Sequence, residues 1–152
     1  MSVETIPDLF LHSVTAYDKS DAFKYKAQGR YVDVSHRDML AAVEKATRGI
    51  LASQLATGDR IALMSENRLE WAIADLAILS AGCVNVPIYA TLPANQVEFI
   101  LRDSESRAVF VSNQDQYEKI RSIRDNLPHL LYVYSFDPIE GATDVLTLGD
   151  LM

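Results

Sequence analysis

The sequence predicts an α/β fold in which a mostly parallel β-sheet carries helices on both faces and is preceded by a β-hairpin. Between residues 60 and 134, short apolar runs alternate with longer segments whose apolar residues recur at helical spacing. The short runs are almost continuously apolar. Such runs are typical of parallel strands that are buried on both faces and joined by right-handed crossover helices.

Residues 1–34 are expected to form a lead-in helix followed by the hairpin. Leu9, Phe10 and Val14 can share one face of an amphipathic helix. Two strand-like segments then flank a turn that contains a glycine, which is a hairpin signal. These segments are residues 22–26 and 31–34, around the turn 27–30.

The α/β core is expected over residues 35–135. A helix is predicted to begin after Ser35, where Asp38 completes an approximate capping box. Another is predicted to begin after Asn67, an N-cap with Glu70 at the reciprocal position. The predicted strands cover residues 60–65, 84–88, 108–111 and 130–134, and the helices between them cover 69–80, 93–104 and 114–126.

Three of these helices have an apolar face that we expect to be buried. In the helix after Ser35, the face comprises Met39, Leu40, Val43, Thr47, Ile50 and Leu51. In the helix whose first turn holds Pro93, it comprises Val97, Ile100 and Leu101. In the helix at 114–126, it comprises Tyr117, Ile120, Ile123 and Leu127. Residues 136–152 are turn-rich and are expected to run into the beginning of a further helix. The length predicts that residues 1–152 form one domain.

Charge and composition argue against several classes of function. The net charge is −7, and no stripe of Lys and Arg offsets it, so binding to nucleic acid or to anionic lipid is not expected. The first residues lack the basic segment and apolar core of a secretory signal. The single cysteine, Cys83, cannot form an internal disulfide, which suits the reducing cytosol. We therefore expect a cytoplasmic protein.

The apolar stretch 71–89 is about as long as a membrane span. Asp75 would cost about 2.5–3.5 kcal/mol near the centre of a bilayer, and Asn85 and Pro87 are also unfavourable there. At Gly82 the residue types change from mostly Ala and Leu to mostly Val, Ile and Tyr. The stretch is therefore predicted to be a helix, a glycine turn and a buried strand, and not a membrane span.

Functional residues of open α/β sheets lie on the loops that follow the carboxyl ends of the strands. Here these loops start at Ser65, Tyr89, Ser112 and Ser135. None of them is a glycine-rich phosphate cradle, and none offers the clustered acids of a phosphoacceptor receiver domain. We therefore assign no catalytic, cofactor-binding or metal-binding residue to this chain.

Individual reactive side chains have structural explanations. Cys83 is expected to be a buried, inert thiol, and Trp71 to pack in the core. Glu66 and Glu70 could act as an acid–base pair, but carboxylates are also favoured at a helix N-terminus, which is the interpretation we prefer. The histidines lie in different predicted elements without metal-ligand spacing, and the lysines lie away from the strand ends. They are His12, His36 and His129, and Lys19, Lys24, Lys26, Lys45 and Lys119.

An ordered series of short motifs carries a resemblance to a known family. The series begins with Gly58-Asp59-Arg60 before a strand, followed by Ser65-Glu66-Asn67 and Glu70-Trp71 around a helix start. It continues with Gly82 and Val86-Pro87 at the next strand. It ends with Tyr89 and Thr91-Leu92-Pro93 before a helix that ends near Asp103-Ser104. With the hairpin at 25–34, this series resembles the N-terminal region of AMP-forming acyl-CoA synthetases, most closely long-chain fatty acid–CoA ligases. The resemblance covers nearly the whole chain.

The resemblance implies that this chain is the scaffold at the N-terminus of a longer ligase that uses ATP, Mg²⁺ and CoA. The family's signature residues are a phosphate loop, an aromatic-Thr-Glu motif, a ribose-binding aspartate and a C-terminal lysine. None of them can be placed on a position of this chain, which is expected to stop before the phosphate loop. The chain is therefore expected to be inactive by itself, and its expected partner is the remainder of the ligase. A homo-oligomer is the other association expected.

Two other functions stay open. The chain could be a stand-alone, dimerising interaction module derived from this scaffold, or a small-ligand-binding α/β domain unrelated to ligases. A reading frame that continues into the phosphate loop would favour the ligase, and a natural stop after Met152 would favour the module. Thermal stabilisation by one metabolite, but not by ATP or acyl-AMP, would favour the third function.

Overall fold

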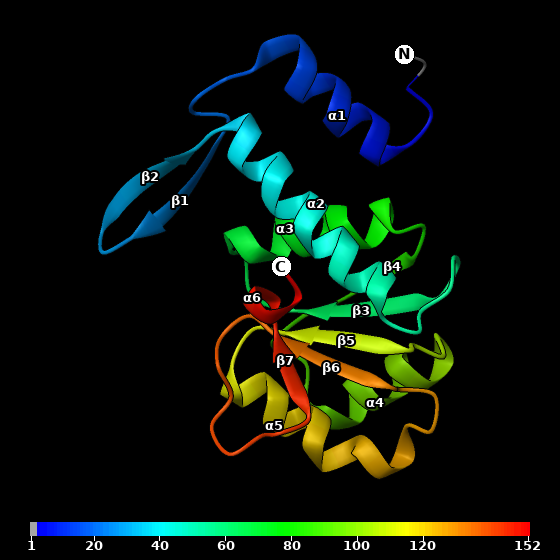
Figure 1. Ribbon diagram of the computed structural model, residues 1–152. Coiled ribbons are helices and arrows are strands. Elements are labelled where there is room, and N and C mark those ends of the chain that lie inside the picture. Colours follow the sequence, from blue (N-terminus) through cyan, green and yellow to red (C-terminus); the bar gives the residue numbers. More distant parts are fainter. Residues whose placement is uncertain (1–2) are drawn as a thin grey trace.

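A five-stranded parallel β-sheet forms the centre of the computed structural model, which describes residues 3–152 (Figure 1). Its strands are β3 (Arg60–Met64), β4 (Val84–Ile88), β5 (Ala108–Val111), β6 (Tyr132–Ser135) and β7 (Val145–Thr147). They lie in the order β4-β3-β5-β6-β7, and every neighbouring pair is parallel. The remaining core elements are α2 (His36–Ala52), α3 (Leu69–Ser80), α4 (Ala94–Asp103), α5 (Gln114–Ile123), the 3₁₀-helix η1 (Arg124–Asn126) and α6 (Leu148–Leu151).

Two hydrophobic cores form on opposite faces of this sheet. In β3, Ile61 and Leu63 enter the core beneath α2 and α3, whereas Ala62 and Met64 enter the core beneath α4 and α5. All four side chains are fully buried. Burial on both faces explains why the strand sequences are continuously apolar and not alternating. The predicted α/β class, with helices on both faces and a preceding hairpin, is confirmed.

The N-terminal part lies outside these layers. Helix α1 (Ile6–Tyr17) packs on α2 and α3, and the hairpin of β1 (Phe23–Ala27) and β2 (Arg30–Val34) projects from the body (Figure 1). Gln28 and Gly29 link the strands with φ angles of 48° and 79°, as in a type I′ turn. The lead-in helix and the hairpin are therefore as predicted.

Two predicted inner faces need correction. Leu9 and Leu51 are 57% and 58% exposed. Each lies one residue, or about 100° around the helix, from a residue that does face the core. Phe10 and Val14 make the inward face of α1, and α2 buries Ile50 together with Met39, Val43 and Ala46.

Ser35 is the N-cap of α2 as predicted, but it forms no capping box, because the Asp38 carboxylate accepts the Ser35 hydroxyl. The Ser35 hydroxyl accepts the N–H of Asp38 at the start of α2. Asn67 is not the N-cap of α3; Arg68 is, and no side chain caps this helix. Because Arg68 binds the Glu70 carboxylate, Glu70 does not act as a capping partner. Pro93 likewise occupies the N-cap of α4 and not its first turn.

The stretch 71–89 forms a helix, a turn and a strand, as predicted. Gly82 makes the turn with φ 75°, a conformation that favours glycine. The strand, β4, is an edge strand in which Ile88 is the one buried residue, so the expectation of a buried strand is wrong. Within residues 3–152, no helix is both long and apolar enough to cross a membrane.

The turn-rich segment after residue 135 contains a strand that we did not predict. Val145–Thr147 pairs with β6 and extends the sheet to five strands. Three residues are too few to show a clear periodicity. The expected helix start follows directly as α6, and the Thr147 hydroxyl and the Asp150 carboxylate form its capping box.

Candidate functional site

The carboxyl edge of the sheet is the candidate site, because the loops after β3, β5 and β6 converge there. We use "carboxyl edge" for the polar residues of these loops and of the first turns of α3 and α5. They are Ser65, Glu66, Asn67, Arg68, Glu70, Ser112, Gln116, Ser135 and Asp137. Of the four positions named from the sequence, Ser65, Ser112 and Ser135 lie in these loops, and Tyr89 follows edge strand β4 and is exposed. The three serine side chains do not make a reactive cluster.

Arg68 organises the carboxyl edge. Its Nε and Nη2 donate to Glu70 at 2.8 and 3.1 Å, and its Nη2 and Nη1 donate to Asp137 at 2.9 and 3.1 Å. Its guanidinium also lies 5.4 Å from the ring centre of Phe136, within the range of a cation–π contact. These hydrogen bonds raise the pKa of Arg68 and lower that of Glu70. We call Arg68, Glu70 and Asp137 the arginine clasp.

The surroundings of Glu66 and Glu70 bear on their two interpretations. Glu70 is held as a salt-bridged carboxylate, so it is not poised to accept or donate a proton near neutral pH. Glu66 accepts a hydrogen bond from Gln116 Nε2 at 3.4 Å. Burial alone would raise the pKa of Glu66, but neighbouring hydrogen bonds and the Arg68 charge outweigh it and lower that pKa. Both carboxylates are structural anions in this arrangement.

Three buried polar atoms at this edge have no hydrogen-bond partner within the described residues. They are the hydroxyls of Ser112 and Ser135 and the Oε1 atom of Gln116. A serine nucleophile needs a base within hydrogen-bond distance that can take its proton. Neither hydroxyl makes a hydrogen bond with good geometry to a described residue, and Glu66, the carboxylate that Ser112 influences, has a lowered pKa and is therefore a weak base. The two serines therefore provide no catalytic pair.

Lys119 is an exception to the prediction that the lysines lie away from the strand ends. From α5, its Nζ donates to the carbonyls of Ala90 and Leu92, at 2.6 and 3.0 Å, in the loop after β4. No sequence signal indicates this contact, because it depends on how closely α5 lies to that loop. Since two of its three donors bind the protein's own backbone, Lys119 braces the loop.

The Cys83 thiol and the His36 imidazole are also structural. Cys83 is 6% exposed, and burial raises the pKa of its thiol, which disfavours the reactive thiolate. His36 accepts the backbone N–H of Lys19 at its Nδ1 atom, 3.0 Å away, and its ring meets Phe23 edge-on. His12 lies in α1, and His129 lies in the turn between η1 and β6. Across residues 3–152 no group of three or more His, Cys, Asp or Glu side chains could hold a metal ion.

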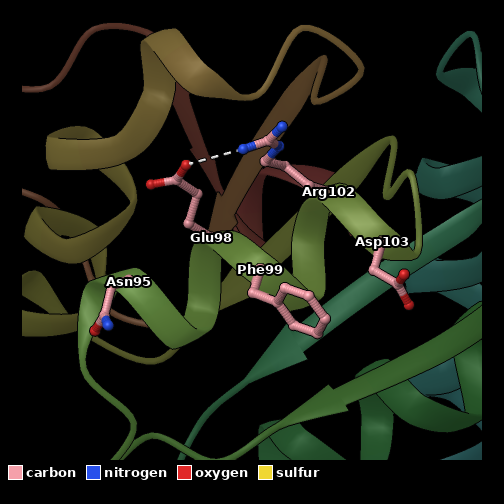
Figure 2. A pocket seen from close by; sticks show the side chains of 5 residues that line it. All are labelled: Asn95, Glu98, Phe99, Arg102 and Asp103. Atoms are coloured by element: carbon pink, nitrogen blue, oxygen red, sulfur yellow. Dashed lines mark ion pairs between the residues drawn. The ribbon is translucent and has the colours of Figure 1, made fainter.

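Trp71 packs against the core beneath α2 and α3, as predicted. It also lines a hollow of about 390 Å³ at the end of β4, with Ser65, Asn67, Pro87, Ile88 and Tyr89. A second hollow, of about 590 Å³, lies on α4 (Figure 2). Its five lining residues all come from this one helix, with Glu98 and Arg102 3.6 Å apart and the Phe99 ring projecting beside them. A single helix face cannot enclose a small ligand.

A third hollow, of about 610 Å³, lies between the hairpin and the start of α3. We call it the hairpin cleft. One wall is Phe23–Lys26 of β1, and the other consists of Asn67–Glu70 and Ala72. Because Arg68 and Glu70 belong to this wall, the cleft opens directly beside the arginine clasp.

Comparison with known proteins relates the chain to a family of enzymes. Residues 10–148 match the family described as AMP-binding enzyme. The long-chain-fatty-acid–CoA ligase FadD15 of Mycobacterium bovis is 34% identical over 102 residues, which are 67% of this chain and 17% of that protein. The ligase ACSBG1 of Bos taurus is 27% identical over 150 residues, 97% of this chain and 21% of that protein.

A solved structure shows the same fold. Acetoacetyl-CoA synthetase from Streptomyces lividans superimposes with a TM-score of 0.84 over 95% of this chain and 24% of that chain, at 18% sequence identity. This chain thus spans about a sixth to a fifth of the length of the two curated relatives.

Proposed function

Because the chain belongs to the family of AMP-binding enzymes, we propose that it is the N-terminal scaffold of a fatty acid–CoA ligase. The observation that carries this proposal is a family match over residues 10–148 together with long-chain-fatty-acid–CoA ligases among the relatives. The fold is consistent with a scaffold, since the described side chains at the carboxyl edge bind one another. We propose a cytoplasmic location for the ligase.

The proposed ligase works in two steps. A carboxylate oxygen of the fatty acid attacks the α-phosphorus of ATP, and the bond to the bridging oxygen breaks, so that pyrophosphate leaves with both electrons. The thiolate of CoA then attacks the acyl carbon, and the bond from this carbon to the AMP oxygen breaks. Both steps place negative charge on phosphate oxygens, so fixed donors, cations or a metal ion must stabilise that charge.

The described residues do not fit the groups that stabilise such charge. No group of three or more carboxylate, imidazole or thiol side chains in residues 3–152 could hold Mg²⁺. The two cations that the structure places by the loops after the strand carboxyl ends bind other groups: Arg68 binds two carboxylates, and Lys119 binds two carbonyls. We therefore propose that the rest of the ligase supplies the sites for ATP, Mg²⁺ and CoA, and that the chain alone has no catalytic residue.

We propose one structural domain over residues 1–152. Within it, residues 1–34 form the lead-in, 35–135 the α/β core and 136–152 the tail. The tail is more closely joined to the core than a linker would be, since β7 pairs with β6 and α6 packs on α2.

The test of the ligase proposal is ATP–pyrophosphate exchange with a panel of fatty acids. We expect no fatty-acid-dependent exchange above a buffer blank for the 152-residue chain. We expect exchange, and AMP release on addition of CoA, for the longer protein that the gene encodes. Exchange by the 152-residue chain would contradict its role as a scaffold without catalytic residues. A longer protein that is inert towards every carboxylate would overturn the ligase proposal itself.

A further inference from the structure

The outward face of α4 is centred on an exposed aromatic ring. Val97 and Leu101 of this helix are buried in the core beneath α4 and α5. Phe99 lies two residues from each of them, about 200° around the helix axis, and it is 69% exposed. Phe99 therefore points away from the core, and a second surface that covered its ring would remove apolar area from water.

The polar groups on either side of Phe99 are arranged symmetrically. Asn95 lies four residues before it and Asp103 four residues after it, so the three side chains form one row along the helix (Figure 2). The Asn95 amide has two N–H donors, whereas an ionised Asp103 has only acceptors. Among the five side chains of this face, the ion pair is the one between Glu98 and Arg102. The row therefore presents a donor, a ring and an acceptor in that order.

Such a row is complementary to a second copy of itself that runs in the opposite direction. At a two-fold axis, residue i of one copy contacts residue j of the other, and the reverse contact forms as well. An antiparallel pair of α4 helices centred on Phe99 brings the two rings together and sets Asn95 opposite Asp103 of the second copy, twice. With a rise of 1.5 Å per residue, Arg102 then lies about 3 Å along the axis from Glu98 of the second copy.

Other occupants fit this face of α4 less well. A single helix face does not enclose a small ligand. Glu98, Arg102 and Asp103 place charges of both signs on it, so it is not the cationic patch that anionic lipid or nucleic acid requires. The length of α4 also limits the contact, since ten residues span about 15 Å. The contact is therefore at the small end of specific protein interfaces.

We propose that the outward face of α4 is a self-association surface, through which two copies of this chain form a symmetric antiparallel dimer. The inference does not depend on the proposed ligase activity. Helix α4 lies on the opposite face of the sheet from α2 and α3 (Figure 1), so the dimer leaves that layer and the hairpin uncovered. Because the contact is small, we expect a dissociation constant of about 10–100 μM.

Sedimentation velocity of the 152-residue chain and of the longer protein that the gene encodes tests the proposal. Phe99→Glu places two carboxylates together at the two-fold axis, so we expect the dissociation constant to rise at least about tenfold. Tyr31→Glu is the matched control, because it adds the same charge at a residue that is 74% exposed on the hairpin. We expect this control to change the dissociation constant by less than about twofold.

A reciprocal exchange tests the antiparallel register separately from the apolar contact. Asn95→Asp alone sets two carboxylates opposite each other and should raise the dissociation constant about fivefold or more. It should not weaken α4, because an acid is favoured in the first turn of a helix. The double variant Asn95→Asp/Asp103→Asn exchanges donor and acceptor, so we expect it to restore the dissociation constant of the parent chain.

Each other outcome overturns the proposal. A chain that is monomeric at every accessible concentration has no such surface, and a dimer that Phe99→Glu leaves intact uses another one. If the double variant associates as weakly as Asn95→Asp alone, the antiparallel pairing of Asn95 with Asp103 is wrong. A dimer of the 152-residue chain that is absent from the longer protein would mean that the rest of that protein, and not a second copy, covers α4.

Discussion

The guanidinium of Arg68 joins a carboxylate in the first turn of α3 to a carboxylate in the loop after β6. Glu70 lies two residues away in sequence, and Asp137 lies in the connection between β6 and β7. Their side chains remain 27%, 35% and 46% exposed for Arg68, Glu70 and Asp137, so solvent screens the pair energies. The paired fork geometry and the Phe136 ring nevertheless make the clasp stronger than a single surface ion pair.

Replacing Arg68 tests the clasp at the scale of one residue. We expect Arg68→Ala to lower the free energy of unfolding at neutral pH by about 1–2 kcal/mol, measured by urea denaturation. The control is Arg121→Ala, which removes an exposed ion pair with Glu118 and should have a smaller effect. If the two variants lose equal stability, Arg68 contributes no more than a surface charge.

Acid pH should act on the same clasp. The pKa of Glu70 is lower in the folded state than in the unfolded state, chiefly because Arg68 hydrogen-bonds to it. Its contribution is therefore present above the unfolded-state pKa, about 4.3, and is lost as pH falls through the lower folded-state pKa. We expect Arg68→Ala to show a shallower decline of stability below about pH 4.5 than the parent chain. Parallel declines would contradict the role of this carboxylate.

Helix α6 docks on α2 at a glycine. A Cβ atom at Gly49 would lie 2.4 Å from the Leu151 carbonyl oxygen and 2.8 Å from the Leu151 Cβ. Glycine within a helix costs about 0.5–1 kcal/mol relative to alanine, so the close approach of α6 explains its presence. This contact, together with the β6–β7 pairing, joins the tail to the core.

The Gly49 contact gives a prediction at the scale of elements. We expect Gly49→Ala to displace α6, seen as faster amide exchange over residues 145–151, with little net gain in melting temperature despite the better helix former. Gly149→Ala is the matched control, because its nearest contact would be 3.5 Å, an ordinary van der Waals distance. A stabilised Gly49→Ala chain with unchanged exchange would show that α6 does not press on this position.

The whole molecule exposes large apolar side chains on several elements. Ile6 and Tyr17 of α1 are 59% and 64% exposed, Tyr89 after β4 is 80% exposed, and Phe99 of α4 is 69% exposed. Edge strand β4 leaves a further open surface, although Pro87, which has no N–H, limits strand pairing there. The open edge of β4 and these exposed apolar side chains are features through which chains can associate.

Self-association is the prediction at this scale. We expect the 152-residue chain to form dimers or larger species at micromolar concentration, measured by light scattering. Because each copy carries a charge of −7, added salt should screen the repulsion and increase the association. A monomer at every salt concentration that binds no hydrophobic dye would contradict this expectation.

The sequence by itself determined the fold class and most elements. The apolar runs at 61–64 and 108–111 predicted buried parallel strands, and Ser35 predicted the start of α2. These signals are local, because each depends on residues within about one helical turn or on the alternation of faces along a strand. The absence of a phosphate loop was equally readable, since such a loop is a contiguous motif.

Only the tertiary structure decided which residues meet. Arg68 contacts Asp137 from 69 positions away, and Lys119 contacts Ala90 from 29 positions away. The strand order places β4 at the sheet edge and β7 beside β6. Such contacts depend on the relative placement of whole elements, which is set by the packing of the two cores and not by any local pattern. For that reason the elements were predictable from the sequence, whereas the clasp, the edge strand and the hairpin cleft were not.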